Sequence, residues 1–152
     1  CPGRAGRGRT RAGAPSRTGG VLSGSGARGA GPHAVRRLVR ENHPRWASLG
    51  EFLALAGSFR HLSDSTGNRG AAVLSESLDL ATGRLLDENK SPSRKAGEID
   101  NRGSTFYLAL FWAEELASQT QGAELAAAFA KIARTLREKE AVSSEELMAG
   151  QG

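Results

Sequence analysis

The chain has few of the residues that usually stabilise or stiffen a small protein. Among its 152 residues there is one cysteine, Cys1, and only 5% are aromatic. A single cysteine excludes an internal disulfide and gives no sign of an oxidising compartment. No apolar run approaches the roughly 18 residues of a membrane span, and no apolar signal segment follows the basic start. We therefore expect a soluble, cytoplasmic protein with a core of alanine and leucine.

Methionine is nearly absent as well. The sequence begins with Cys1, and its one methionine is Met148. Because a complete open reading frame begins with methionine, we expect this chain to be a fragment of a longer protein.

Acidic residues are almost missing from the first part of the chain. Residues 1–45 contain ten arginines and a single acid, whereas residues 46–152 contain eleven basic and fifteen acidic residues. Residues 1–30 consist mostly of glycine, arginine, alanine and serine. Such a composition cannot offset the entropy of ordering, so we expect this tract to be disordered. It has no Phe or Tyr to stack on bases, and nucleic-acid binding is not expected of it.

Residues 31–152 have the periodicity of helices, and no stretch alternates for long enough to indicate a strand. The predicted fold class is therefore mainly α. A first helix is expected from Ala34 until Pro44 ends it. A second is predicted over 49–62 with Ser48 as its N-cap. The apolar face of this second helix is formed by Leu49, Phe52, Leu53, Ala56 and Phe59.

The second half of the chain is predicted to be helical in the same way. A polar loop over 64–70 leads into a helix over 71–89, whose apolar residues are Val73, Leu74, Leu78, Ala81 and Leu85. Ser104 is expected to cap a helix over 105–118 that is apolar on every side in its first half, a pattern typical of a helix buried from several directions. Two more helices are predicted over 123–140 and 143–150.

A cationic loop separates the two most apolar helices. Its sequence KSPSRK, residues 90–95, combines three cations with two serine hydroxyls, and Pro92 stiffens the turn. Arginine offers a planar fork to a phosphate, and serine offers a short neutral contact. The segment EIDNRGS is expected to form a tight turn at Gly103 and to lead into a helix N-terminus, where anions are favoured. The loop is interpreted either as a solvated connection or as a phosphate site, and no Walker-type spacing decides between them.

A second basic cluster, GPHAVRRLVRENHPRW, favours the same chemistry. Much of it is expected to form a solvated helix face. Arg45 lies beside Trp46 at the helix break, where its guanidinium can pair with a phosphate or stack on an adenine. His33 is a further candidate. The histidines lack metal-ligand spacing, and no nucleophile–base pair can be named, so the residues alone predict an anion-recognising piece of something larger without a reaction.

Three segments closely resemble consecutive stretches of the monomeric-type NADP-dependent isocitrate dehydrogenases, near the C-terminus of that family. They are GPHAVRRLVRENHPRW, WASLGEFLALAGSFRHL and LLDENKSPSRKAGEIDNRGSTFYLALFWAEELASQT. The similarity runs from about Gly19 to Gly152, whereas residues 1–18 match nothing in the family. The resemblance implies that residues 31–152 are the helical C-terminal part of the cofactor-binding α/β domain of a larger enzyme. It further implies a monomeric enzyme that oxidatively decarboxylates isocitrate to 2-oxoglutarate, reduces NADP and uses magnesium or manganese.

The same resemblance implies roles for individual residues. Arg94 and Arg45 correspond to residues that contact the 2′-phosphate end of NADP. A cofactor-contacting histidine of the family aligns with Ala34 without a gap, so either a one-residue shift makes its neighbour His33 the contact or the contact is missing here. Two other polar positions of the family are alanines in this chain, Ala30 and Ala47. The family's isocitrate-binding, catalytic and metal-binding residues lie upstream, so we expect no catalytic or metal-binding residue here and no activity of the fragment alone.

Two alternatives stay open. The chain can be a stand-alone helical module that binds nucleic acid or another polyanion through its basic N-terminus, with binding that is sensitive to salt. It can also be a gene remnant without function.

Overall fold

A computed structural model describes residues 35, 38–45 and 49–152 of the chain. Residues 38–41 are helical, and five helices follow. They are α2 (Leu49–Thr66), α3 (Arg69–Asp87), α4 (Asn101–Ser118), α5 (Ala123–Glu138) and α6 (Glu140–Ala149). The described residues include no strand and no helix that is long and apolar enough to cross a membrane. The predicted mainly α fold is therefore confirmed, whereas the predicted disorder of 1–30 lies outside the described residues.

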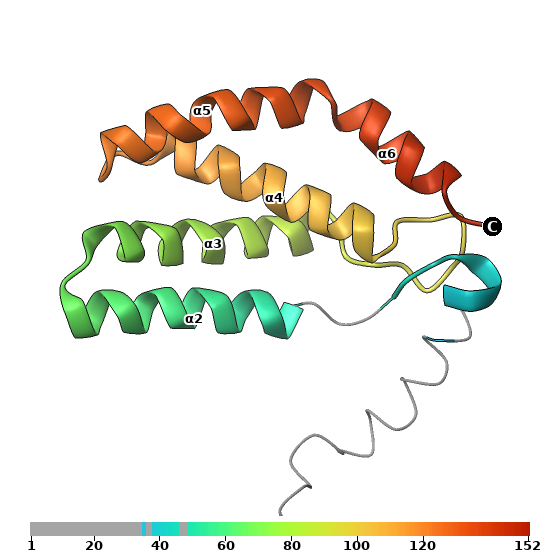
Figure 1. Cartoon of the computed structure of the whole chain (residues 1–152), viewed down its shortest axis with the longest axis horizontal. Coiled ribbons are helices and arrows are strands. Elements are labelled where there is room, and N and C mark those ends of the chain that lie inside the picture. Colours follow the sequence, from blue (N-terminus) through green and yellow to red (C-terminus); the bar gives the residue numbers. More distant parts are fainter. Residues whose placement is uncertain (1–34, 36–37, 46–48) are drawn as a thin grey trace, which may run out of the picture.

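The helices pack in the order in which they follow one another. Helix α2 packs on α3, α3 on α4 and α4 on α5, while α6 contacts both α4 and α5. Figure 1 shows the resulting row, with α6 continuing from α5 above the first half of α4. The loop between α3 and α4, the short helical segment that ends at Glu41 and the last described residues all lie at one end of this row.

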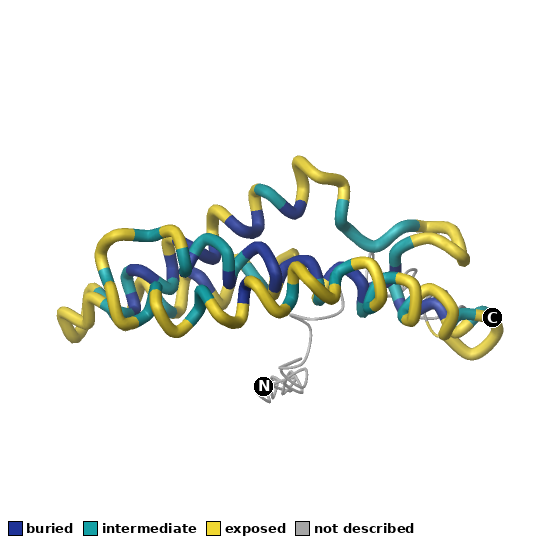
Figure 2. Tube along the Cα trace, turned by 90° about the horizontal axis from the view of Figure 1, so that it is seen from above, coloured by how far each residue is buried: buried dark blue, intermediate teal, exposed yellow. Residues whose placement is uncertain are grey.

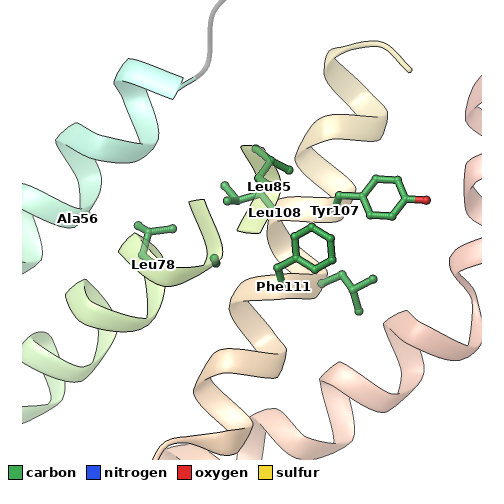
Figure 3. Packing of buried hydrophobic residues seen from close by; sticks show 8 residues of the cluster. Ala56, Leu78, Leu85, Tyr107, Leu108 and Phe111 are labelled. Atoms are coloured by element: carbon green, nitrogen blue, oxygen red, sulfur yellow. The ribbon is translucent and has the colours of Figure 1, made fainter. Parts of the chain in front are cut away.

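Helix α4 is the centre of the core. Nine of its residues are buried, and Phe111, Leu110 and Leu116 have no exposed surface. Phe111 and Leu110 belong to one core cluster with residues of α3, from which Leu78 and Leu85 point toward Phe111 and Leu108 (Figure 3). The prediction of a helix buried from several directions is confirmed, because α3, α5 and α6 all contact α4.

Helix α2 is much less buried than its sequence predicts. Of its five predicted apolar contacts only Ala56 is buried, and Leu53 is 52% exposed. The reason is its place at the edge of the row, because α3 packs along it whereas α4 reaches it through the ring of Trp112, whose centroid lies 6.2 Å from that of Phe59. Figure 2 shows that buried residues gather along the middle of the molecule, whereas its outer turns and ends are exposed.

The predicted loop over 64–70 is wrong for most of its length. Helix α2 continues to Thr66 and α3 begins at Arg69, so Gly67 and Asn68 alone connect them. The hydroxyl of Thr66 donates to the carbonyl of Leu62 at 2.6 Å, which supports the last turn of α2. The side-chain oxygen of Asn68 accepts from the N–H of Ala71 at 3.1 Å and caps α3. Polar residues of a type common in loops therefore stabilise the end of α2 and the start of α3.

The start of α4 also differs from its prediction. The cap is Asp100, whose carboxylate accepts from the N–H groups of Arg102 at 2.8 Å and Gly103 at 3.2 Å. Ser104 lies inside the first turn, and its buried hydroxyl has no hydrogen-bond partner. Gly103 makes a close approach rather than a turn, because a Cβ there would lie 2.9 Å from the side chain of Ile99.

Truncation of Phe111 tests the position of the core. We expect Phe111→Ala to lower the free energy of unfolding by about 3–5 kcal/mol, because it leaves a cavity between α3 and α4. Urea unfolding of the chain, followed by circular dichroism, measures this difference. The control Leu80→Ala removes a side chain that is 61% exposed on α3, and its effect should stay within about 0.5 kcal/mol. Equal losses in the two variants would contradict a core centred on α4.

The two candidate caps of α4 can be separated in the same assay. Asp100→Ala removes the cap and the 2.6 Å ion pair with Arg102, so we expect a loss of about 2–3 kcal/mol in the free energy of unfolding. Ser104→Ala removes a hydroxyl without a partner and should change that free energy by less than about 0.5 kcal/mol. A larger loss of unfolding free energy for Ser104→Ala than for Asp100→Ala would indicate that Ser104 is the cap, as the sequence predicts.

Candidate functional site

The cationic loop between α3 and α4 is a closed turn. The N–H of Ser93 donates to the carbonyl of Ile99 at 2.7 Å, which joins the two ends of the turn. Within it, the N–H of Lys95 donates to the hydroxyl of Ser93 at 3.1 Å, and that hydroxyl donates to the carboxylate of Glu98. Gly97 has a φ of 81°, a conformation that side chains rarely adopt. The tip of the loop is thus shaped by its own hydrogen bonds.

The cations of this loop have different surroundings. The ammonium group of Lys90 lies 4.1 Å from the centre of the Tyr107 ring, in a cation–π contact. The ammonium group of Lys95 lies 3.6 Å from the carboxylate of Glu98. The hydrogen bond from Ser93, helped by the charge of Lys95, lowers the pKa of Glu98. The three cations and two serines of KSPSRK are the donors predicted to form a phosphate site. Of these, the hydroxyl of Ser93 is used within the loop, while the side chain of Arg94 is exposed.

The basic segment before α2 lies directly against this loop. Asn42, with a φ of 42°, ends the helical segment, and His43 and Pro44 are buried behind it. The Nε2 of His43 lies 3.1 Å from the carbonyl oxygen of Ser93, and the N–H of Asn101 donates to the carbonyl of Pro44 at 2.9 Å. These contacts hold together the two segments that carry Arg45 and Arg94.

Gln151, which is more than 50 residues further along the chain, contacts both the loop and the basic segment. Its Oε1 lies 2.8 Å from the Nδ1 of His43 and accepts from the N–H of Gly97 at 2.8 Å. Its amide nitrogen donates to the carbonyl of Glu98 at 2.9 Å. Sequence reasoning missed both His43, which was expected on a solvated face, and Gln151, for which no local pattern exists.

Arg45 is a predicted site residue whose guanidinium group has a buried donor. It is half-buried, and its Nε is buried with no hydrogen-bond partner among the described residues. A buried donor that lacks an acceptor costs about 1–3 kcal/mol. An oxygen of a bound anion would satisfy it, and guanidinium groups favour phosphate for this role. The third predicted residue, His33, and Trp46 beside Arg45 lie outside the described residues.

The N-terminus of α4, which is expected to favour anions or acidic groups, is occupied by the carboxylate of Asp100. Its first N–H groups are already bonded to the carbonyl of Pro44 and to the carboxylate of Asp100. The negative charge of Asp100 occupies the position that an anion would take. Arg102 compensates this charge at 2.6 Å and also donates to the carbonyl of Asn42 at 2.9 Å. Recognition of an anion here therefore depends on side chains and not on the helix end.

A cavity of about 240 Å³ lies between the loop, α4 and α6. Its lining includes Lys90, Tyr107 and Ser144, and the hydroxyls of Tyr107 and Ser144 are 3.2 Å apart. This volume is below the roughly 300–1,000 Å³ of typical ligand pockets. The described part of the chain contains no group of three His, Cys, Asp or Glu side chains that could hold a metal ion.

Comparison with known proteins gives a single family. The family model of monomeric isocitrate dehydrogenase matches residues 13–152, so the expectation that the resemblance stops near Gly19 is wrong for residues 13–18. The isocitrate dehydrogenases (NADP) of Corynebacterium glutamicum and Azotobacter vinelandii are 55% and 53% identical to the chain over 138 residues. Isocitrate dehydrogenase (NADP) 2 of Colwellia maris is 53% identical over the same length.

Each of these three alignments covers 91% of this chain but 19% of the relative. The chain therefore spans about a fifth of the length of the curated relatives that it matches. Because the family model covers the sequence from residue 13 to its last residue, the chain belongs to the monomeric isocitrate dehydrogenase family.

Proposed function

We propose that this chain is the part of an NADP-dependent isocitrate dehydrogenase that recognises the 2′-phosphate of NADP. Arg94 and Arg45 are the residues that contact this phosphate, and His33 is a further contact. The relatives are named for NADP, and the two arginines occupy the family positions that the resemblance assigns to the cofactor. The observation that carries the proposal is the buried, unpartnered Nε of Arg45 on a segment bonded to the loop of Arg94.

The arrangement suits a phosphate that must be distinguished from a hydroxyl. NAD has a 2′-hydroxyl where NADP has a dianionic phosphate, so charge at this position selects NADP. Two guanidinium groups on separate segments can approach different oxygens of one phosphate, and each offers a planar pair of donors. Arg94 is exposed on the loop, where an incoming nucleotide can reach it, whereas Arg45 is half-buried.

The remaining chemistry belongs to residues outside this chain. NADP, when bound, supplies the nicotinamide that accepts a hydride from isocitrate, and the oxidised product loses carbon dioxide to give 2-oxoglutarate. Isocitrate and the magnesium or manganese ion are assigned by the resemblance to upstream residues of the same polypeptide. We propose that the complete enzyme is a monomer and that this chain has no activity by itself.

Replacing Arg94 tests the proposed recognition in an active enzyme. We would place residues 13–152 of this chain into the Corynebacterium glutamicum enzyme, in place of the matching segment, and introduce Arg94→Ala. Loss of one charged hydrogen-bonding partner, worth about 1.5–3 kcal/mol, should raise the KM for NADP by about tenfold or more. The KM for NAD should not change, because NAD has no 2′-phosphate. Initial rates of isocitrate-dependent reduction of each cofactor measure both constants.

The matched control is Arg134→Ala, which removes an exposed arginine on α5 and should leave both constants unchanged. An unchanged KM for NADP in the Arg94→Ala enzyme would contradict the proposed role of the loop. Salt-sensitive binding of RNA by the chain, lost on removal of residues 1–30, would instead support the polyanion-binding alternative.

A further inference from the structure

We propose that Gln151 and His43 form a clamp that positions Arg94 and Arg45 for the phosphate. This inference rests on the proposed function and adds two positioning residues to it. Neither residue is expected to touch the nucleotide. Gln151 fixes the loop of Arg94 from one side, and His43 joins that loop to the segment of Arg45.

The side-chain amide of Gln151 has one orientation that satisfies its neighbours. The N–H of Gly97 must face an oxygen, and the carbonyl of Glu98 must face an N–H donor. Both conditions are met when Oε1 lies 2.8 Å from Gly97 and the amide nitrogen lies 2.9 Å from Glu98. This orientation places Oε1, an acceptor, opposite the Nδ1 of His43 at 2.8 Å.

His43 then has acceptors on both sides of its ring. Nδ1 faces the oxygen of Gln151 and Nε2 faces the carbonyl oxygen of Ser93 at 3.1 Å. The ring donates both hydrogen bonds together when it carries a proton on each nitrogen. The ring is fully buried, so the contact joins the loop of Arg94 to the segment of Arg45 at a position that solvent does not reach.

The clamp is held in place by the backbone around it. The N–H of Gly152 donates to the carbonyl of Glu41 at 3.0 Å, and the side chain of Asn42 donates to the carbonyl of Gly150. Residues 150–152 are thereby paired with residues 41–43, and Gln151 is fixed between them. Without Gln151, the tip of the loop would depend on the hydrogen bonds within the turn, and part of the binding energy would be lost in ordering Arg94.

The first experiment measures the clamp itself in the 152-residue chain. Gln151→Met keeps the length of the side chain and removes its hydrogen bonds to His43, Gly97 and Glu98, whereas Gln151→Glu keeps the oxygen that faces Gly97 and His43. We expect hydrogen exchange of the Gly97 amide, followed by NMR, to become at least about tenfold faster with methionine and to change much less with glutamate. The control is Gln121→Ala, which removes another exposed glutamine whose amide donates to Glu76 at 3.2 Å, far from the loop in sequence.

The second experiment measures what the clamp does for phosphate recognition. NMR titrations of the same chain with adenosine 2′,5′-bisphosphate and with adenosine 5′-monophosphate isolate the contribution of the 2′-phosphate. Gln151→Met should weaken binding of the bisphosphate by about five- to tenfold and leave the monophosphate unchanged. His43→Ala should do the same, and the double variant should lose little more than the larger single loss, because the two residues act as a unit. Thermal unfolding of each variant confirms that it is folded under the conditions used.

The possible results separate the two proposals. If Arg94→Ala removes the preference for the bisphosphate while Gln151→Met leaves it intact, the proposed function holds and the clamp is wrong. If the wild-type chain binds the two nucleotides equally, both proposals are overturned. Additive losses in the double variant, or unchanged exchange at Gly97 in Gln151→Met, would also overturn the clamp.

Discussion

The pair of hydrogen bonds made by buried His43 determines the arrangement of the whole site. One bond reaches the carbonyl of Ser93 and the other reaches Gln151, so a single ring joins three segments that are far apart in the sequence. The helical row positions these segments at one end of the molecule (Figure 1), but packing of apolar side chains does not specify the relative position of two polar loops. A directional contact made at a buried position does so, because its donors and acceptors must be satisfied.

The capping of α4 sets the chemistry of recognition. Asp100 occupies the helix N-terminus with its own carboxylate, so the backbone N–H groups that often bind phosphate are not available. Arg102 balances that carboxylate and bonds to Asn42, which couples the start of the central helix to the basic segment. In the proposed recognition of phosphate, the donors are therefore the side chains of Arg45 and Arg94, and charged guanidinium groups bind a phosphate more strongly than neutral amides do.

The sequence predicts the helices well and the site only in part. Helical periodicity identifies α3 and α4 because their apolar residues face neighbours on several sides, whereas the face of α2 cannot be judged without knowing that α2 lies at an edge. The choice between Asp100 and Ser104 as a cap cannot be made from type alone, since both are favoured caps. The arginine candidates come from local motifs and from family resemblance. Gln151 could not be found, because its contacts are with residues 53 to 108 positions away.

The ion pairs around the loop explain how several cations can lie close together. Cations held close together repel one another, and this repulsion is reduced when neighbouring charges are paired. Lys95 is paired with Glu98, whose pKa is lowered by Ser93 and by the charges of Lys95 and His43. Arg102 is likewise paired with Asp100. These ion pairs reduce the repulsion among the cations around the loop and support its fold, and the guanidinium geometry of Arg94 and Arg45 suits the proposed phosphate.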